Sequence, residues 1–309
     1  MSQFVEEPTP SRLGEFLAYC SDFGKLHDDS FVPSAGFEPT AERPSFALRD
    51  DELRIVGAAS LLLTRSQVAG GRGRFAILHA GGAGRGGREG YRALLGAALS
   101  AARGVVPVLY LFLPADLEIP TSYLLEAGFV SERIAYLMGR DSLHATGPGL
   151  PESYALEEVL RGDRVRLEEF VAVRNRNFAE VLGSLPSSIE DWEEFYDESE
   201  ALHGGTLLLR APDGKACGTI HLERDEEPEA FFIGAISVDA NRRGQGLGRG
   251  LVREALGRGR RAGFSKAYLS VNALNEKALG LYLEEGFTVR KAMNCLAVRI
   301  EDLERSLRP

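Results

Sequence analysis

The feature that most constrains the fold of this chain is an internal duplication. The 309-residue sequence aligns with itself without a gap when residues 85–129 are placed on residues 243–287, an offset of 158 positions. Thirteen of the 45 aligned positions are identical, whereas residue composition alone would give roughly three. Residues 46–61 and 207–222 align in the same way at an offset of 161. Because the repeat is of domain size, the sequence predicts two homologous domains and not a solenoid of short repeats.

The stretch ATGPGLPES, residues 145–153, separates the two copies. It carries two prolines and two glycines and has no apolar periodicity, which is typical of a linker. The sequence therefore predicts a first domain at 1–145 and a second at 152–309, each long enough to bury its own core.

The second copy predicts strands and helices in alternation. Apolar patterns predict strands at 154–160, 231–238, 267–271 and around MNCLAVRI, and a hairpin within 207–222 that turns at Asp213 and Gly214. Helical spacing predicts helices at 166–179, 189–198 and 275–285, and a further helix directly after the glycines that follow residue 243. A strand, helix, strand unit implies a parallel pair with a right-handed crossover. We expect each domain to be an α/β fold with a mixed, mostly antiparallel sheet flanked by helices.

Composition excludes several classes of protein. The formal net charge of −9 leaves no dominant basic face for nucleic-acid phosphates. No apolar stretch approaches the roughly 20 residues that span a bilayer, and the acidic N-terminus lacks the layout of a signal peptide. The three cysteines form no CxxC pair, and the histidines have no metal-ligand spacing. We expect a cytoplasmic protein with no metal and no nucleic-acid or membrane partner; a monomer and a homodimer both stay open.

The segment RRGQGLG, residues 242–248, lies between a predicted buried strand and a predicted helix. The first N–H groups of a helix lack intrahelical partners and lie at the positive end of its dipole, so this junction favours an anion. Glycines let the backbone approach a phosphate closely, and arginines add positive charge. A solvated turn without a ligand is the alternative. The glycines are Gly244, Gly246 and Gly248, and the nearby arginines are Arg242, Arg243 and Arg249.

Together with NEKALGLYLEEGF, residues 275–287, this segment resembles the GCN5-related N-acetyltransferases (GNAT) over residues 154–298. The pyrophosphate loop of that family follows [R/Q]-x-x-G-x-[G/A], which matches residues 243–248 here. The resemblance implies that acetyl-CoA lies between splayed parallel strands at 231–238 and 267–271. It assigns the acetyl-CoA contacts to Ile236, Ser237, Val238, Arg243, Gly244, Gln245, Gly246, Leu247, Gly248 and Asn275.

The resemblance also implies that an amine attacks the thioester directly and that a tyrosine, as general acid, protonates the departing thiolate. Tyr282 is the matching residue, and the ordinary tyrosine pKa of about 10 suits that role. A core aromatic side chain is the alternative interpretation of Tyr282. Asn275 lies two helical turns before it and is also suited to cap the helix.

The general base is not identified, because the strand at 231–238 contains no carboxylate. His221 and Glu223 share a face of the preceding strand, and Glu229 lies just before residue 231, so any of them could accept a proton through water. The alternative is that each is an ordinary polar side chain.

The first copy has lost residues on which this chemistry depends. Under the alignment Gly246 becomes Arg88, Asn275 becomes Leu117 and Tyr282 becomes Leu124. Pro120 is expected to interrupt the helix of that copy. We expect the first domain to support folding or to shape the substrate cleft, and coenzyme A binding there stays open.

These observations predict an acetyl-CoA-dependent N-acetyltransferase whose active site lies in the second domain and whose acceptor is a small or peptide-borne primary amine. The length and domain order are similar to those of mycothiol synthase, which acetylates a cysteinyl amine, so that amine is one candidate. Acidic residues at 190–198 and 223–229 either attract a cationic amine or form a solvated face. A non-enzymatic acyl-CoA sensor is the alternative from another class of protein, because the base is missing.

Overall fold

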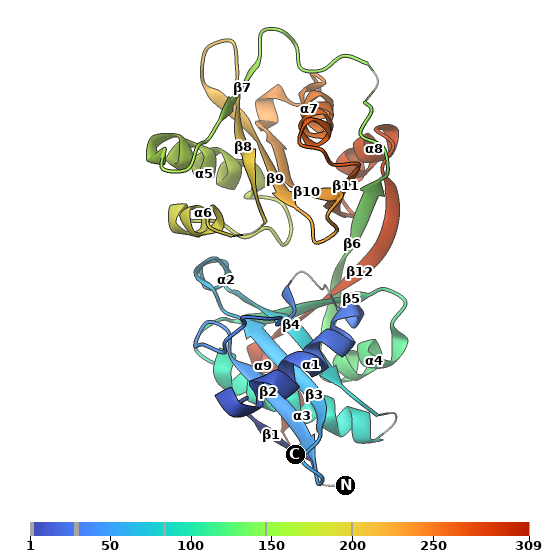
Figure 1. Ribbon diagram of the computed structural model, residues 1–309. Helices are drawn as coiled ribbons and strands as arrows, with labels where there is room; N and C mark the ends of the chain where they lie inside the picture. Colours follow the sequence, from blue (N-terminus) through green and yellow to red (C-terminus); the bar gives the residue numbers. More distant parts are fainter. Residues whose placement is uncertain (1–2, 28–30, 83–84, 146, 199, 309) are drawn as a thin grey trace. The chain divides into compact units, whose positions relative to one another are not determined.

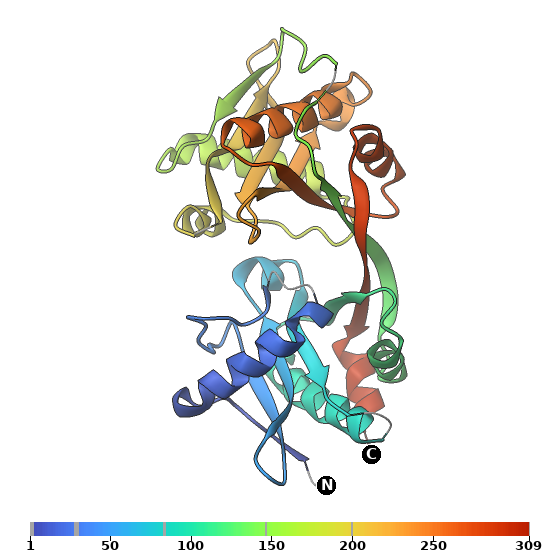
Figure 2. The ribbon, with the colours of Figure 1, turned by 45° about the vertical axis from the view of Figure 1, so that its right-hand side comes forward.

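The computed structural model describes residues 3–27, 31–82, 85–145, 147–198 and 200–308. The chain divides into two compact units, one of Met1–Ala135 with Ala292–Pro309 and one of Tyr136–Lys291. In each unit helices flank a mixed sheet (Figure 1; Figure 2), which confirms the fold class predicted from the sequence.

The first unit orders its strands β1-β2-β3-β4-β5-β12, with β4 and β5 parallel and the other neighbouring pairs antiparallel. Its main core lies between the sheet and helices α3, α4 and α9, and a smaller apolar cluster lies under α1 on the other face. The elements are β1 (Gln3–Glu6), α1 (Leu13–Phe23), β2 (Ser45–Asp50), β3 (Ile55–Leu62), α2 (Arg65–Ala69), β4 (Arg72–Ala80), α3 (Arg85–Ala102), β5 (Val108–Pro114), α4 (Glu118–Glu126) and α9 (Ile300–Leu307), with short 3-10 turns at Pro10–Arg12 and Gly24–Leu26.

The second unit orders its strands β6-β11-β10-β9-β8-β7, with β10 and β11 parallel and β7 to β10 antiparallel. Helix α7 packs on one face of this sheet and α5 and α6 on the other, each over its own apolar cluster. The strands and helices predicted for the second copy are therefore confirmed. They are β7 (Ala155–Glu158), α5 (Arg164–Phe178), α6 (Ile189–Phe195), β8 (Ala201–Arg210), β9 (Ala216–Arg224), β10 (Ala230–Val238), α7 (Leu247–Arg261), β11 (Lys266–Asn272) and α8 (Glu276–Glu284).

Two strands belong to both units. β6 (Val130–Arg140) enters the second unit at Tyr136, and β12 (Thr288–Arg299) enters the first unit at Ala292. Within the first unit, β12 pairs with β5 from Met293↔Pro114 to Arg299↔Val108. The compact units therefore differ from the sequence repeats of 1–145 and 152–309, since the end of the second repeat packs in the first unit. An alignment of the chain with itself identifies segments of common ancestry. It does not identify the strand with which a terminal strand pairs.

Pro120 does not interrupt its helix, so that expectation is wrong. Helix α4 begins at Glu118, which places Pro120 in the first turn. The N–H that proline lacks would have no helical partner at that position, and the helix tolerates it.

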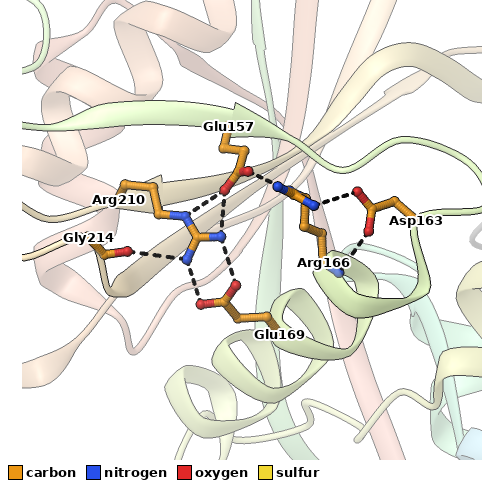
Figure 3. Close-up of polar contacts among 6 residues, drawn as sticks. All are labelled: Glu157, Asp163, Arg166, Glu169, Arg210 and Gly214. Carbon is orange, nitrogen blue, oxygen red and sulfur yellow. Dashed lines mark hydrogen bonds and ion pairs between the residues drawn. The ribbon is translucent and has the colours of Figure 1, made fainter.

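An arginine on β8 joins three elements of the second unit (Figure 3). The Arg210 guanidinium donates to Glu157 on β7 at 2.6 Å and to both oxygens of Glu169 on α5 at 2.6 and 2.7 Å. Arg166 donates to Glu157 from the other side and to Asp163, the N-cap of α5. Because the Arg210 side chain is half-buried and donates to both oxygens of Glu169, this ion pair stabilises the fold more than an exposed ion pair does.

We expect Arg210→Met to lower the free energy of unfolding by about 1–2 kcal/mol, because it leaves two carboxylates without their shared partner. Urea denaturation measures the change. The matched control is Arg161→Met, because Arg161 makes a single ion pair with Asp197 in which both side chains are exposed. Equal losses in the two variants would contradict the role given to Arg210.

The same network predicts a pH dependence. Arg166 and Arg210 hold the pKa of Glu157 below its ordinary value through hydrogen bonds and charge. A carboxylate of this kind stabilises the fold fully above its unfolded pKa of about 4.3, and the stabilisation is lost as the pH falls through the lower folded pKa. The stability difference between the wild type and Arg210→Met should therefore narrow in acid, as measured by urea denaturation between neutral pH and about pH 3.

Candidate active site

Strands β10 and β11 run parallel and then part. Their pairing extends from Ala230↔Lys266 to Ile233↔Leu269 and ends there, while β10 stays paired with β9 as far as Val238. One edge of β10 beyond Ile233 therefore carries backbone N–H and C=O groups that the described strands leave unpaired. This confirms the splayed parallel pair predicted from the sequence.

Ile236, Ser237 and Val238 lie on this part of β10. The Ser237 hydroxyl bonds to Thr219 at 2.7 Å and accepts from Asn177 at 3.1 Å, on the face covered by α5. Ile236 and Val238 turn the other way, into the apolar cluster under α7. The side chains of all three are thus engaged, which leaves only their backbone groups for a ligand.

A short 3-10 helix, η4 (Ala240–Arg242), and a glycine turn lead from β10 into α7. Gly244 and Gly246 have φ of 79° and 77°, and a Cβ at either would meet no atom within 4 Å, so backbone conformation and not space requires glycine there. Gly246 is the N-cap of α7, and no side chain caps the first turn. The N–H groups of that turn are left to solvent or to a ligand.

Gly248 has a different reason, if any, to be glycine. It lies inside the first turn of α7, where a Cβ would make only an ordinary contact with Leu281 at 3.5 Å. Among the described residues nothing excludes a larger side chain, so only the close approach of a ligand would require glycine.

Two of the three arginines near the turn are engaged by carboxylates, which the sequence did not predict. Arg249 donates to Glu284 and, at 2.9 Å, to Glu285, which are the last residue and the C-cap of α8. Arg242 lies 3.5 Å from the carboxylate of Asp213. Their charge is therefore largely neutralised within the protein.

Arg243 is the arginine left for an anion. Its Nε donates to the carbonyl of Val238 at 3.1 Å, and it pairs with no carboxylate in the part of the chain that the structure describes. Next to it, Gln245 accepts a hydrogen bond from the Tyr154 hydroxyl at 3.3 Å, which ties the turn to the segment before β7.

Helix α8 carries the predicted acid. Its N-cap is Asn275, which accepts from the Ala278 N–H at 3.3 Å, so the predicted cap is confirmed. Tyr282 packs edge-on against Phe287 with ring centroids 5.9 Å apart, and its hydroxyl makes no hydrogen bond to the residues described. Burial raises the pKa of Tyr282 to about 12, above the ordinary value assumed from the sequence. The side chain is therefore protonated throughout the physiological range and can act only as a donor.

His221 and Glu223 lie together on β9. His221 Nε2 is 3.0 Å from Glu223 Oε1, and its Nδ1 is 3.3 Å from Thr206 Oγ1. His221 is 4% exposed, whereas the Glu223 side chain is 30% exposed. Glu229, the third candidate from the sequence, contacts Ser265 at 3.3 Å and is not part of this group.

Among its described residues, the first unit shows no counterpart of the glycine turn at the aligned positions. Helix α3 begins at Arg85, so Gly86 and Arg88, which align with the two left-handed glycines, lie within the helix. Arg88 donates to Glu126 at 3.1 Å, and Leu124, which replaces the predicted acid, is fully buried.

Within the described ranges, no three side chains are grouped as metal ligands. Nor does that part of the chain contain a helix that is both long and apolar enough to cross a membrane.

Comparison with known proteins connects this geometry to a family. Residues 168–287 match the model of the acetyltransferase (GNAT) family. Among solved structures, the chain is similar to a GCN5-related N-acetyltransferase from Sphaerobacter thermophilus, with a TM-score of 0.71 and 17% identity over 96% of each chain. It is also similar to a tandem GNAT protein from the clavulanic acid biosynthesis pathway, with a TM-score of 0.67 and 16% identity over 97% of this chain and 98% of that one.

A third similar structure is a GCN5-related glucosamine N-acetyltransferase region of a fungal multi-domain enzyme, with a TM-score of 0.72 and 15% identity. The match covers 96% of this chain but 38% of that one. At these identities the structural matches establish the fold. No curated protein matches the sequence significantly.

Proposed function

We propose that the chain, in which residues 168–287 match the model of the acetyltransferase (GNAT) family, transfers the acetyl group of acetyl-CoA to a primary amine. One observation carries the proposal. The unpaired edge of β10 leads directly into a turn with two left-handed glycines and an uncapped helix N-terminus. This path offers backbone groups that can bind amides and then an anion site. That is the order required by a ligand whose amide-bearing arm is joined to a pyrophosphate.

The residues present fit acetyl-CoA as the donor substrate. The backbone N–H groups of residues 243–248 would bind the pyrophosphate, with Arg243 adding charge. The backbone of residues 236–238 would bind the amide-bearing arm, and Asn275 at the head of α8 would be a further contact.

The reaction class is direct acyl transfer, for which acetyl-CoA supplies an activated thioester. The ammonium group of the acceptor first gives a proton to a base, His221 or Glu223. The amine nitrogen then forms a bond to the acetyl carbon while the carbon–sulfur bond breaks. Tyr282 donates a hydrogen bond to the departing sulfur and then its proton, and the second proton that the nitrogen loses as the amide forms passes through water to restore the hydroxyl. A donor with a pKa of about 12 stays protonated for this purpose at any assay pH.

The test is the release of free coenzyme A thiol from acetyl-CoA in the presence of a panel of primary amines. The panel includes simple alkylamines, glucosamine, a peptide N-terminus and a cysteinyl amine. Glucosamine is chosen because a structurally similar region is named for its acetylation, and the cysteinyl amine because of the similarity to mycothiol synthase. We expect thiol release that depends on one class of amine. Acetyl-CoA binding without amine-dependent release would favour the acyl-CoA sensor instead.

A further inference from the structure

A chain of polar contacts runs from Thr206 on β8 through His221 to Glu223 on β9, and it ends where β10 and β11 part. Taking the acetyl-transfer function above as given, we propose that Glu223 is the general base and that Thr206, His221 and Gly234 position it. The sequence leaves the base undecided between His221 and Glu223, and the geometry separates them.

The imidazole of His221 is fixed on all sides. Trp192 and Phe195 of α6 pack edge-on against it, with ring centroids at 4.5 and 4.8 Å and interplanar angles of 89° and 74°. One ring nitrogen faces Thr206 and the other faces Glu223, at 3.3 and 3.0 Å. A buried ring that lies against two aromatic side chains and whose two nitrogens face protein oxygens cannot turn freely toward a substrate.

The partners of His221 assign its protons. An ionised carboxylate has no hydrogen to donate, and a bare ring nitrogen 3.0 Å from Glu223 Oε1 would be repelled by it, so the neutral ring carries its hydrogen on Nε2. Nδ1 is then the acceptor for the Thr206 hydroxyl. His221 thus has no free nitrogen with which to take a proton from an amine, and it serves as a positioning residue.

Glu223 has a free oxygen. Its Oε1 is held by His221, and its Oε2 makes no hydrogen bond within the described residues. The side chain is 30% exposed, so an ammonium group can reach it. The proton of the ammonium would form an O–H bond with Oε2 and leave the nitrogen lone pair free to attack.

Gly234 provides the space for this carboxylate. It is the extra residue of a β-bulge between Ile233 and Ala235, and Ile233 is also the last residue of β10 that pairs with β11. A Cβ on Gly234 would lie 2.2 Å from Glu223 Oε1. The bulge, the parting of the strands and the carboxylate therefore coincide, and any larger residue at 234 would displace the base.

The first experiment measures the protonation of His221 directly and needs no acceptor. Nitrogen-15 NMR of the imidazoles at pH 7, with the His221 signals identified by their loss in His221→Gln, is expected to show a neutral ring with its hydrogen on Nε2. A hydrogen on Nδ1, or a doubly protonated ring, would overturn the arrangement proposed for Thr206, His221 and Glu223 whatever the protein catalyses.

The second experiment uses acetyl-CoA and the best amine of the panel. We expect Glu223→Gln to lower kcat by about 10²- to 10⁴-fold, because the amide keeps the shape but cannot take a proton, while the Kd for acetyl-CoA stays within about twofold. The matched control is Glu229→Gln, which should leave kcat unchanged. A kcat for Glu223→Gln near that of the control would contradict the assignment.

The positioning residues have their own variants. Thr206→Val keeps the shape but loses the hydroxyl, and we expect kcat to fall about tenfold, with Thr206→Ser restoring it. Gly234→Ala should lower kcat. Glu223→Asp, which shortens the side chain, should lower kcat less in the Gly234→Ala variant than it does in the wild type. Failure of Thr206→Ser to recover, or fully additive losses, would overturn the roles given to Thr206 and Gly234.

The two experiments separate this proposal from the function on which it rests. If no amine is acetylated, the acetyl-transfer function fails and the base assignment fails with it, whatever the tautomer. If amines are acetylated and the tautomer or the variants disagree, only the assignment of Glu223 and its positioning residues is overturned.

Discussion

Gly246→Arg is expected to weaken acetyl-CoA binding at least about a hundredfold. A left-handed residue with a side chain costs roughly 1–2 kcal/mol, and relief of that strain would collapse the turn whose N–H groups bind the pyrophosphate. At the aligned position of the first unit, Arg88 lies inside α3 and not in a left-handed turn. Isothermal titration calorimetry with acetyl-CoA measures the loss.

In Gly246→Arg the added positive charge and the strained backbone are expected to have opposite effects on acetyl-CoA binding. An added guanidinium attracts a pyrophosphate, so tighter or unchanged binding would indicate that charge dominates and would contradict the role of the turn. The matched control is Gly263→Arg at the other end of α7. Gly263 has a φ of 93° and open space around it, so the strain is similar but the site is distant.

Tyr282→Phe is expected to lower kcat on the order of a hundredfold, while the Kd for acetyl-CoA changes by less than about twofold. The phenyl ring keeps the packing against Phe287 and loses only the hydroxyl. Because burial raises the pKa of Tyr282 to about 12, the wild type should show no loss of kcat from this group up to about pH 11.

The control for this variant is Tyr268→Phe, which removes a hydroxyl that donates to Glu227 at the paired end of β11. It should leave kcat unchanged. An unchanged kcat in Tyr282→Phe as well, or a fall in kcat near pH 10, would contradict the role of Tyr282 as a buried donor.

The parts of the site that sequence predicts are those that depend on neighbours along the chain. The glycine turn, the strand before it and the helix after it follow from local composition and apolar spacing, and the structure confirms all three. The cap of α8 by Asn275 is local in the same sense.

The parts that sequence misses depend on contacts across the sheet. Arg249 is neutralised by Glu285, which lies 36 positions later, and the place of Gly234 beside Glu223 follows from a bulge in the pairing of β9 with β10. The crossing of β6 and β12 between the units depends on which strand edges are free after folding. No periodicity along the chain records such pairings.

The central claim is transfer of one acetyl group to an amine, and mass spectrometry of the acceptor tests it most directly. With the amine that releases the most thiol, we predict an N-acetylated product in amounts equal to the thiol released, and far less product with Gly246→Arg at the same acetyl-CoA concentration. Thiol release that is the same with and without amine, or acetyl-CoA that stays bound and intact, would contradict the claim.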